Sequence, residues 1–253
     1  MTDAKTMAYI NMYAVLGTLE NLCELDSKAK EILSTLKKPV GLAFEVKDGP
    51  AATLRFSSNG CTLEEGLMNY DIKIPVSSCE KFNKIIDGTV TPVPTIGLSK
   101  IGFLLKTFTA LTDRLTELMR PSEEALKDRD FFVLSTRLTF YTIAVAISQI
   151  ANYDPIGVHS AEYMVDGDIS LGIKDADMAT IRVKDHHLQT IKKAPEKPRA
   201  IMSFADYDLA SALFNGKVNA LEELCRGTVE IKGMASMIDN MNRLLDRVGI
   251  YLA

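Results

Sequence analysis

The sequence predicts an α+β protein of two similar domains, each a mainly antiparallel sheet covered on one face by helices. A long repeat predicts the two domains, because residues 46–56 recur as residues 173–183 with five of the eleven positions identical. Alternating apolar residues predict strands with one buried and one wet face, as in an antiparallel sheet. Apolar residues at helical spacing predict the covering helices. The repeat offset of 127 residues is about half of the 253-residue chain, so the repeating unit is a whole domain.

The repeat continues downstream, where residues 71–88 correspond to residues 199–216 at an offset of 128. A change of one residue in the offset is a small loop insertion, which a surface turn tolerates. A Pro-containing, charged stretch begins at Arg120 and marks the boundary between the copies. We therefore expect domains at residues 1–120 and 121–253.

Each copy is expected to begin with a helix, followed by two strands. In the first copy, apolar residues at helical spacing predict a helix over 9–24. Alternating apolar residues then predict strands over 42–46 and 54–56. The second copy repeats this strand pattern over 169–173 and 181–183.

A short helix follows the strands of each copy. Ser77 with Glu80 three residues later resembles a capping box, and Gly88 is suited to a left-handed helix end. Asp206 and Gly216 bracket the corresponding helix of the second copy.

Residues 138–151 form the most apolar stretch of the chain, but they fall short of the roughly 20 residues that a membrane-spanning helix needs. Arg137 precedes the stretch, and hydroxyl and amide side chains interrupt it. We therefore expect a buried core helix, around which the two halves form a pseudo-dimer.

Both copies close on an amphipathic helix. The stripe of the first consists of Leu98, Ile101, Leu105, Phe108, Leu111, Leu115 and Leu118, and that of the second of Met234, Met237, Met241, Leu244 and Val248. Each stripe either packs on its own sheet as core or lines an apolar cavity. The methionines favour the cavity slightly, because unbranched side chains repack around variable ligands.

The composition is that of an ordinary globular protein, with 47% hydrophobic and 25% charged residues and a net charge of −4. This charge provides no basic surface for nucleic acid and no polybasic membrane patch. We expect no stable membrane insertion, although transient membrane contact is compatible with the sequence. The four cysteines show no Cys-x-x-Cys pairing and no cleavable signal is recognisable, so reduced thiols and a cytoplasmic location are expected.

Motifs for catalysis are lacking in the sequence. It has no Gly-x-Ser-x-Gly, His-Glu-x-x-His, Walker or Gly-x-Gly-x-x-Gly motif. The histidine cluster at residues 185–187 is better explained by an exposed turn than by a metal site, since adjacent strand residues point to opposite faces. We expect no enzyme activity, no metal and no cofactor.

The second half resembles the sterol-carrier-protein-type lipid-transfer domains. The resemblance covers residues 167–248 and rests on residues 201–204, 208–209, 213–219, 221–224 and 227–233. It implies antiparallel α/β layers around an apolar tunnel for a sterol, fatty acyl or isoprenoid-type lipid. The first half matches over residues 41–118 but departs at residues 92–98, where two prolines replace the family's second short helix and last strand. Whether the first copy binds ligand stays open.

The resemblance implies a non-catalytic protein that binds and transfers an apolar lipid. The candidate cavity wall is Phe204, Leu213, Phe214, Met234, Met237, Met241, Phe103 and Phe108. Two alternatives stand beside this prediction: a scaffold or regulatory module whose cavity has closed, and an enzyme with a site between the two copies. The ligand and the oligomeric state do not follow from the sequence.

Overall fold

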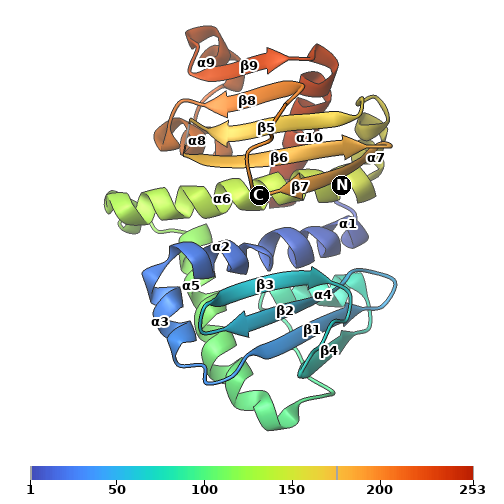
Figure 1. The fold of residues 1–253 in the computed structure, drawn as a ribbon, viewed down its shortest axis with the longest axis vertical. Helices are drawn as coiled ribbons and strands as arrows, with labels where there is room; N and C mark the ends of the chain where they lie inside the picture. The colour runs from blue at the N-terminus through green and yellow to red at the C-terminus, as the bar shows by residue number, and fades with distance from the viewer. Residues whose placement is uncertain (1, 175, 253) are drawn as a thin grey trace. The chain divides into compact units, whose positions relative to one another are not determined.

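A computed structural model describes residues 2–174 and 176–252 (Figure 1). The chain divides into two compact units, unit 1 over residues 3–138 and unit 2 over residues 139–253. This division lies inside the helix α6 (Arg129–Tyr153) rather than at the predicted boundary after residue 120. The reason is that Phe131, Leu134 and Leu138, in the first turns of α6, pack on the core of unit 1.

The sheet of unit 1 has the strand order β3-β2-β1-β4 (Figure 1). Its strands are β1 (Val40–Val46), β2 (Ala51–Ser57), β3 (Gly60–Glu65) and β4 (Ile72–Val76). β1 and β4 run parallel, and the other pairs are antiparallel. This agrees with the predicted α+β class and mainly antiparallel sheet.

The sheet of unit 2 has the order β7-β6-β5-β8-β9. Its strands are β5 (Gly167–Ile173), β6 (Asp177–Lys184), β7 (His187–Ile191), β8 (Ala200–Phe204) and β9 (Val229–Gly233). β5 and β8 are the parallel pair. The order is that of unit 1 with β9 added beside the fourth strand.

The two sheets also share their register. Leu42 pairs with Leu54 in unit 1, and the residues 127 positions later, Ile169 and Ile181, pair in unit 2. For the fourth strand the offset becomes 128, as the sequence repeat predicts: Leu42 pairs with Ile72, and Ile169 with Ala200. The strand orders therefore agree, and a duplication remains our interpretation of that agreement.

The first helical stretch of unit 1 is less regular than predicted. The helices before the sheet are α1 (Ala4–Tyr9), the π-helical segment η1 (Ile10–Val15), α2 (Thr18–Leu25) and α3 (Ser27–Ser34). The helix predicted over 9–24 is therefore interrupted. At the interruption lies Gly17, where a Cβ atom would come within 2.0 Å of the Tyr13 carbonyl oxygen, so this bend requires glycine.

The remaining helices follow or precede the sheets. Unit 1 continues with α4 (Cys79–Ile86), η2 (Leu98–Lys100), the π-helical segment η3 (Phe103–Phe108), α5 (Thr109–Met119) and η4 (Ala125–Lys127). Besides α6, unit 2 has α7 (Pro155–Glu162), α8 (Tyr207–Phe214), α9 (Ala220–Arg226) and α10 (Ala235–Leu252).

The predicted ends of the short helices are largely confirmed. The N-cap of α4 is Ser78 rather than Ser77, because the Ser78 hydroxyl accepts a hydrogen bond from the Lys81 amide at 3.3 Å. Asp206 caps α8 as predicted. Gly88 and Gly216 follow the two helices with φ values of 74° and 63°.

The central strands are buried on both faces, where the alternation predicted one wet face. In β1, Gly41 and Ala43 are buried together with the alternating apolar residues. Their partners in the register are longer: Arg55 lies opposite Gly41, and Thr53 and Lys73 flank Ala43. The small side chains are therefore covered by their neighbours, while the helices pack on the other face.

Helix α6 contains the apolar stretch 138–151, and most of that stretch is buried, as predicted. By length and composition alone α6 could also cross a membrane, but 56% of its apolar window is buried within the protein, a property shared with core helices. The pseudo-dimer expected around this stretch stays a prediction.

The closing helix of unit 1 departs from its predicted stripe. Leu111, Leu115 and Leu118 are buried as expected, but Leu98, Ile101 and Leu105 are exposed, and Phe103 and Leu104 are buried instead. In η3 the backbone hydrogen bonds are π-helical and join residues five positions apart, whereas α-helical bonds join residues four positions apart. The apolar face therefore rotates at η3, which a constant helical period cannot predict.

The histidine cluster forms the predicted exposed turn. Asp185 and His186 connect β6 to β7 with φ values of 50° and 62°. Two successive positive φ angles are those of a tight hairpin turn.

Candidate functional site

Two of the candidate wall residues belong to the packed interior of unit 2. Met237 and Met241 lie on α10 and are fully buried, as are Leu244 and Val248 further along the same stripe. Met234 precedes the helix and is 37% exposed. The methionine stripe thus begins at the surface and continues into the core.

The aromatic candidates of unit 2 form an edge-to-face pair. The rings of Phe204, at the end of β8, and Phe214, at the end of α8, lie 5.6 Å apart at 88°. Leu213 beside them is half-buried. The pair attaches α8 to the sheet.

The candidates of unit 1, Phe103 and Phe108, belong to an aromatic cluster. Phe103 lies 5.4 Å from the ring of Phe56, and Phe108 lies 6.0 Å from Phe56 and 6.4 Å from Phe44. Phe82 of α4 contacts Phe44 at 5.9 Å. These rings fill the space between the sheet and its helices.

An apolar groove of about 340 Å³ lies elsewhere in unit 2, between α9, β9 and the start of α10. We call it the α9–α10 groove. Its walls are Leu224, Ile231, Lys232, Gly233, Ala235, Ile238, Asp239 and Asn242. None of the eight predicted wall residues lines it.

The apolar part of the α9–α10 groove is formed by one side chain from each element. Leu224 of α9 is 38% exposed, Ile231 of β9 is half-buried, and Ile238 of α10 is almost fully buried. Charged and amide groups stand at its rim. Residues 221–224 and 227–233 carry the sequence resemblance, but none of them was predicted as a wall residue. The sequence signal for the groove is Ile238 beside the methionine stripe, together with the apolar positions 224 and 231 of the resembling segment.

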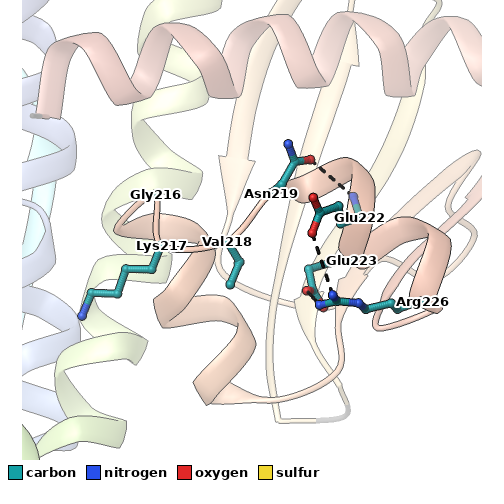
Figure 2. Close-up of a pocket in the computed structure, with 7 residues that line it drawn as sticks. All are labelled: Gly216, Lys217, Val218, Asn219, Glu222, Glu223 and Arg226. Atoms are coloured by element: carbon teal, nitrogen blue, oxygen red, sulfur yellow. Dashed lines mark hydrogen bonds and ion pairs between the residues drawn. The ribbon is translucent and has the colours of Figure 1, made fainter.

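A second, polar depression of about 450 Å³ lies on the other side of α9 (Figure 2). Its lining is Gly216, Lys217, Val218, Asn219, Glu222, Glu223 and Arg226. Figure 2 shows Lys217 directed away from the acidic residues, while Arg226 forms ion pairs with Glu222 and Glu223.

These polar groups stabilise α9. Asn219 caps the helix by accepting hydrogen bonds from the amides of Leu221 and Glu222. The hydroxyl of Thr228 donates to Glu223 at 2.7 Å and, with Arg226, lowers the pKa of Glu223 despite its burial. The Asn219 bonds fix the first turn of α9, and the Glu223–Thr228 bonds link α9 to the residue before β9, so both contribute to one wall of the α9–α10 groove.

A buried ion pair, not anticipated from the sequence, links α10 to α7. Asp154 caps α7, is 1% exposed, and accepts hydrogen bonds from Arg247 at 2.5 Å and from the Tyr251 hydroxyl at 2.7 Å. Burial raises the pKa of Asp154, but the bonds from Arg247 and Tyr251 outweigh it, and the pKa is lowered. The same pair with Asp154 raises the pKa of Arg247.

A second buried carboxylate, also unpredicted, lies at the start of β6. Asp177 is 1% exposed and accepts hydrogen bonds from the hydroxyls of Tyr141 at 3.0 Å and Tyr207 at 2.8 Å. Tyr141 belongs to α6 and Tyr207 to α8. Asp177 therefore joins two helices of unit 2 to its sheet.

Comparison with known proteins finds similarity in solved structures. No family model and no curated protein matches the chain. The sterol carrier protein domain 2 of Helicoverpa armigera is similar at 15% identity with a TM-score of 0.36, over 44% of this chain and 88% of that one. The ubiquinone synthesis protein UbiJ-SCP2 is similar at 11% identity with a TM-score of 0.35, over 45% of this chain and 93% of that one. Apo sterol carrier protein 2 from Yarrowia lipolytica is similar at 18% identity with a TM-score of 0.30, over 40% of this chain and 92% of that one.

These proteins are of the kind that the sequence resemblance predicts. Each covers a stretch of the chain about the size of one copy. At such identities the likeness concerns the arrangement of helices and strands.

Proposed function

We propose that unit 2 binds an apolar lipid, of the sterol, fatty acyl or isoprenoid type, in the α9–α10 groove and transfers it without catalysing a reaction. The observation that carries the proposal is the groove itself, with Leu224, Ile231 and Ile238 facing an open space of about 340 Å³. That volume is at the lower end of the roughly 300–1,000 Å³ of ligand pockets, and the groove is open to solvent along one side. The groove is formed by the segment that carries the sequence resemblance.

The chemistry of the groove suits an alkyl or isoprenoid chain. Its floor is aliphatic, and burial of a chain there is favourable by about 0.8 kcal/mol per CH₂ group. The rim carries Lys232, Asp239 and Asn242, which can stay hydrated beside a polar head. Binding by burial needs no charged anchor inside the groove.

The methionine stripe gives the groove a means to adapt. Ile238 of the groove lies on α10 between Met237 and Met241. Both methionines are fully buried, and unbranched side chains repack at low cost. In this proposal a longer ligand is accommodated by their movement.

Paired substitutions on α9 test the proposal. Leu224→Glu places a charge in the groove, and we expect it to abolish saturable binding in a titration with a fluorescent fatty acid. Leu221→Glu is the matched control, since Leu221 lies one turn earlier on α9, is 68% exposed and does not line the groove. Equal binding by both variants, or none in the micromolar range by the wild type, would contradict the proposal.

A scaffold or regulatory role is the second candidate, and the complete burial of Met237 and Met241 favours it. In that case the interior of unit 2 is fully packed and does not open to take up a ligand. The fatty-acid titration distinguishes the two candidates, because a scaffold shows no saturable uptake.

A further inference from the structure

One segment of unit 1 exposes an unusual run of aliphatic side chains. Between α4 and α5 the exposed large apolar residues are Val93 (70%), Ile96 (47%), Leu98 (64%), Ile101 (39%) and Leu105 (70%). We call them the 93–105 face. In most globular proteins large exposed apolar residues are scattered singly, whereas a contiguous group marks an interaction surface.

The segment is held firmly from its inner side. Phe103 and Leu104 are buried, and Phe103 lies 5.4 Å from the ring of Phe56. At its start, Ile96 forms a β-bridge with Lys73 of β4. The outward direction of Leu98, Ile101 and Leu105 is therefore fixed by the packing of their neighbours.

The charge of the segment is opposite to that of the protein. No Asp or Glu occurs between Asp87 and Asp113, whereas Lys100 and Lys106 do, in a chain of net charge −4. Lys100 forms an ion pair with Asp71 at 2.7 Å and is itself partly exposed, and Lys106 is exposed. The 93–105 face thus combines aliphatic side chains with lysines.

We propose that the 93–105 face docks on the surface of an anionic lipid bilayer. Aliphatic side chains with lysines beside them are typical of segments that lie in the membrane interface, where lysines meet anionic head groups. Protein interfaces, in contrast, are enriched in aromatic residues, Met and Arg and depleted in Lys. Here the aromatic residues Phe103 and Phe108 pack inward, and the large apolar side chains that are exposed are all aliphatic. The inference goes beyond lipid binding by unit 2 and does not require it.

Vesicle flotation of the full chain tests the inference. We expect the wild type to float with vesicles of phosphatidylcholine and phosphatidylserine, more weakly with phosphatidylcholine alone, and less at high salt. Leu98→Glu with Leu105→Glu should reduce partitioning by roughly tenfold or more. Leu221→Glu, an equally exposed leucine of unit 2, should leave it unchanged.

Further measurements separate the alternatives. The circular dichroism spectrum of the double variant should be unchanged, because both leucines are exposed. Lys106→Glu tests the same face by charge alone and should also reduce flotation. Undiminished flotation of both variants would overturn the proposal. So would a wild type that does not float but sediments as a dimer that the double variant loses, since the face would then bind a second copy. The fatty-acid titration without vesicles should not change in the double variant, which separates this inference from the function of the groove.

Discussion

Units 1 and 2 follow the same path up to the positive-φ glycines after their short helices, Gly88 and Gly216, and then diverge. The two units become equivalent again at Gly97 and Gly233, which occupy corresponding positions beside the fourth strand of each sheet. Both have positive φ, and a Cβ atom on either would come within 2.3 Å of the carbonyl oxygen of the residue immediately before the fourth strand, Asp71 in unit 1 and Arg199 in unit 2. Between the glycines, unit 2 has α9 and β9, whereas unit 1 has a shorter Pro-containing loop with a single β-bridge.

This difference shows how one scaffold presents two surfaces. In unit 2 the additional α9 and β9 form the α9–α10 groove over the start of α10. In unit 1 no such elements are found among the described residues, and the corresponding start of the closing helix is the exposed 93–105 face. Our two proposals accordingly place ligand binding in unit 2 and membrane docking in unit 1.

A feature that both units keep is a buried ion pair between a helix cap and the closing helix. In unit 1, Asp26 caps α3 and binds Arg114 of α5 at 2.9 Å. In unit 2, Asp154 caps α7 and binds Arg247 of α10. The pair stabilises the orientation of the helix that carries each surface.

The largest effect is expected from Asp154→Ala. It removes the cap of α7 and leaves Arg247 and the Tyr251 hydroxyl without their buried acceptor, so the free energy of unfolding of unit 2 should fall by about 3–5 kcal/mol. Urea unfolding of the full chain, followed by circular dichroism, measures it. Asp26→Ala should cost less, because Arg114 also binds Glu117 at 2.7 Å. A larger loss for Asp26→Ala would break this comparison.

Met237→Trp should have the next largest effect. Met237 is fully buried, so the larger ring overpacks the interior and should cost about 1–3 kcal/mol. Ile101→Trp is the matched control, four residues after Gly97 as Met237 is after Gly233, and its 39% exposure leaves room for the ring. Thermal melts of both variants decide the point. An unchanged melting temperature in Met237→Trp, together with lost fatty-acid binding, would instead identify a cavity at Met237.

Acid should destabilise unit 2 through Asp154. Its pKa in the folded protein is lowered from the ordinary value of 3.8. A lowered folded-state pKa adds stability that is fully present above the unfolded value and is lost as the pH falls through the folded value. Unfolding free energy should therefore decrease below about pH 4. Asp154→Asn, which can still cap α7, should show a flatter decrease, and an identical pH profile would contradict this role.

The smallest effect is expected at the exposed pair Arg182–Asp168. The arginine side chain is 48% exposed, and its bond to Asp168 at 2.8 Å is open to solvent. Arg182→Ala should leave the free energy of unfolding nearly unchanged, because solvent screens an exposed ion pair. Its counterpart Arg55, which donates to the Asn69 carbonyl, should behave alike in the same urea titration. A loss of several kcal/mol at either position would show that the sheets differ more than their register suggests.

The sequence allowed prediction of the features that are local or repeated. Alternation over 42–46 and 169–173, together with the change in offset from 127 to 128, predicted equivalent strands, and the register follows both offsets. Asp206 and Gly216 were predicted as helix ends because capping depends on one or two residues. These features require no knowledge of distant contacts.

Features that depend on distant contacts or on irregular helix geometry could not be predicted. Arg114 and Asp26 are 88 residues apart, and Arg247 and Asp154 are 93 apart. The π-helical turn at Phe103–Phe108 rotates the apolar face, so Leu98 and Leu105, expected inside, lie outside. The α9–α10 groove needs three elements to converge, which spacing along one helix does not reveal.

Native mass spectrometry of the freshly purified full chain tests the assignment of ligand binding to unit 2 most directly. We predict one bound lipid per chain, retained in Leu221→Glu and lost in Leu224→Glu. Two lipids per chain, or one lipid that persists in Leu224→Glu, would contradict the assignment to the α9–α10 groove. No bound lipid, together with no saturable fatty-acid binding, would contradict the lipid-binding function itself.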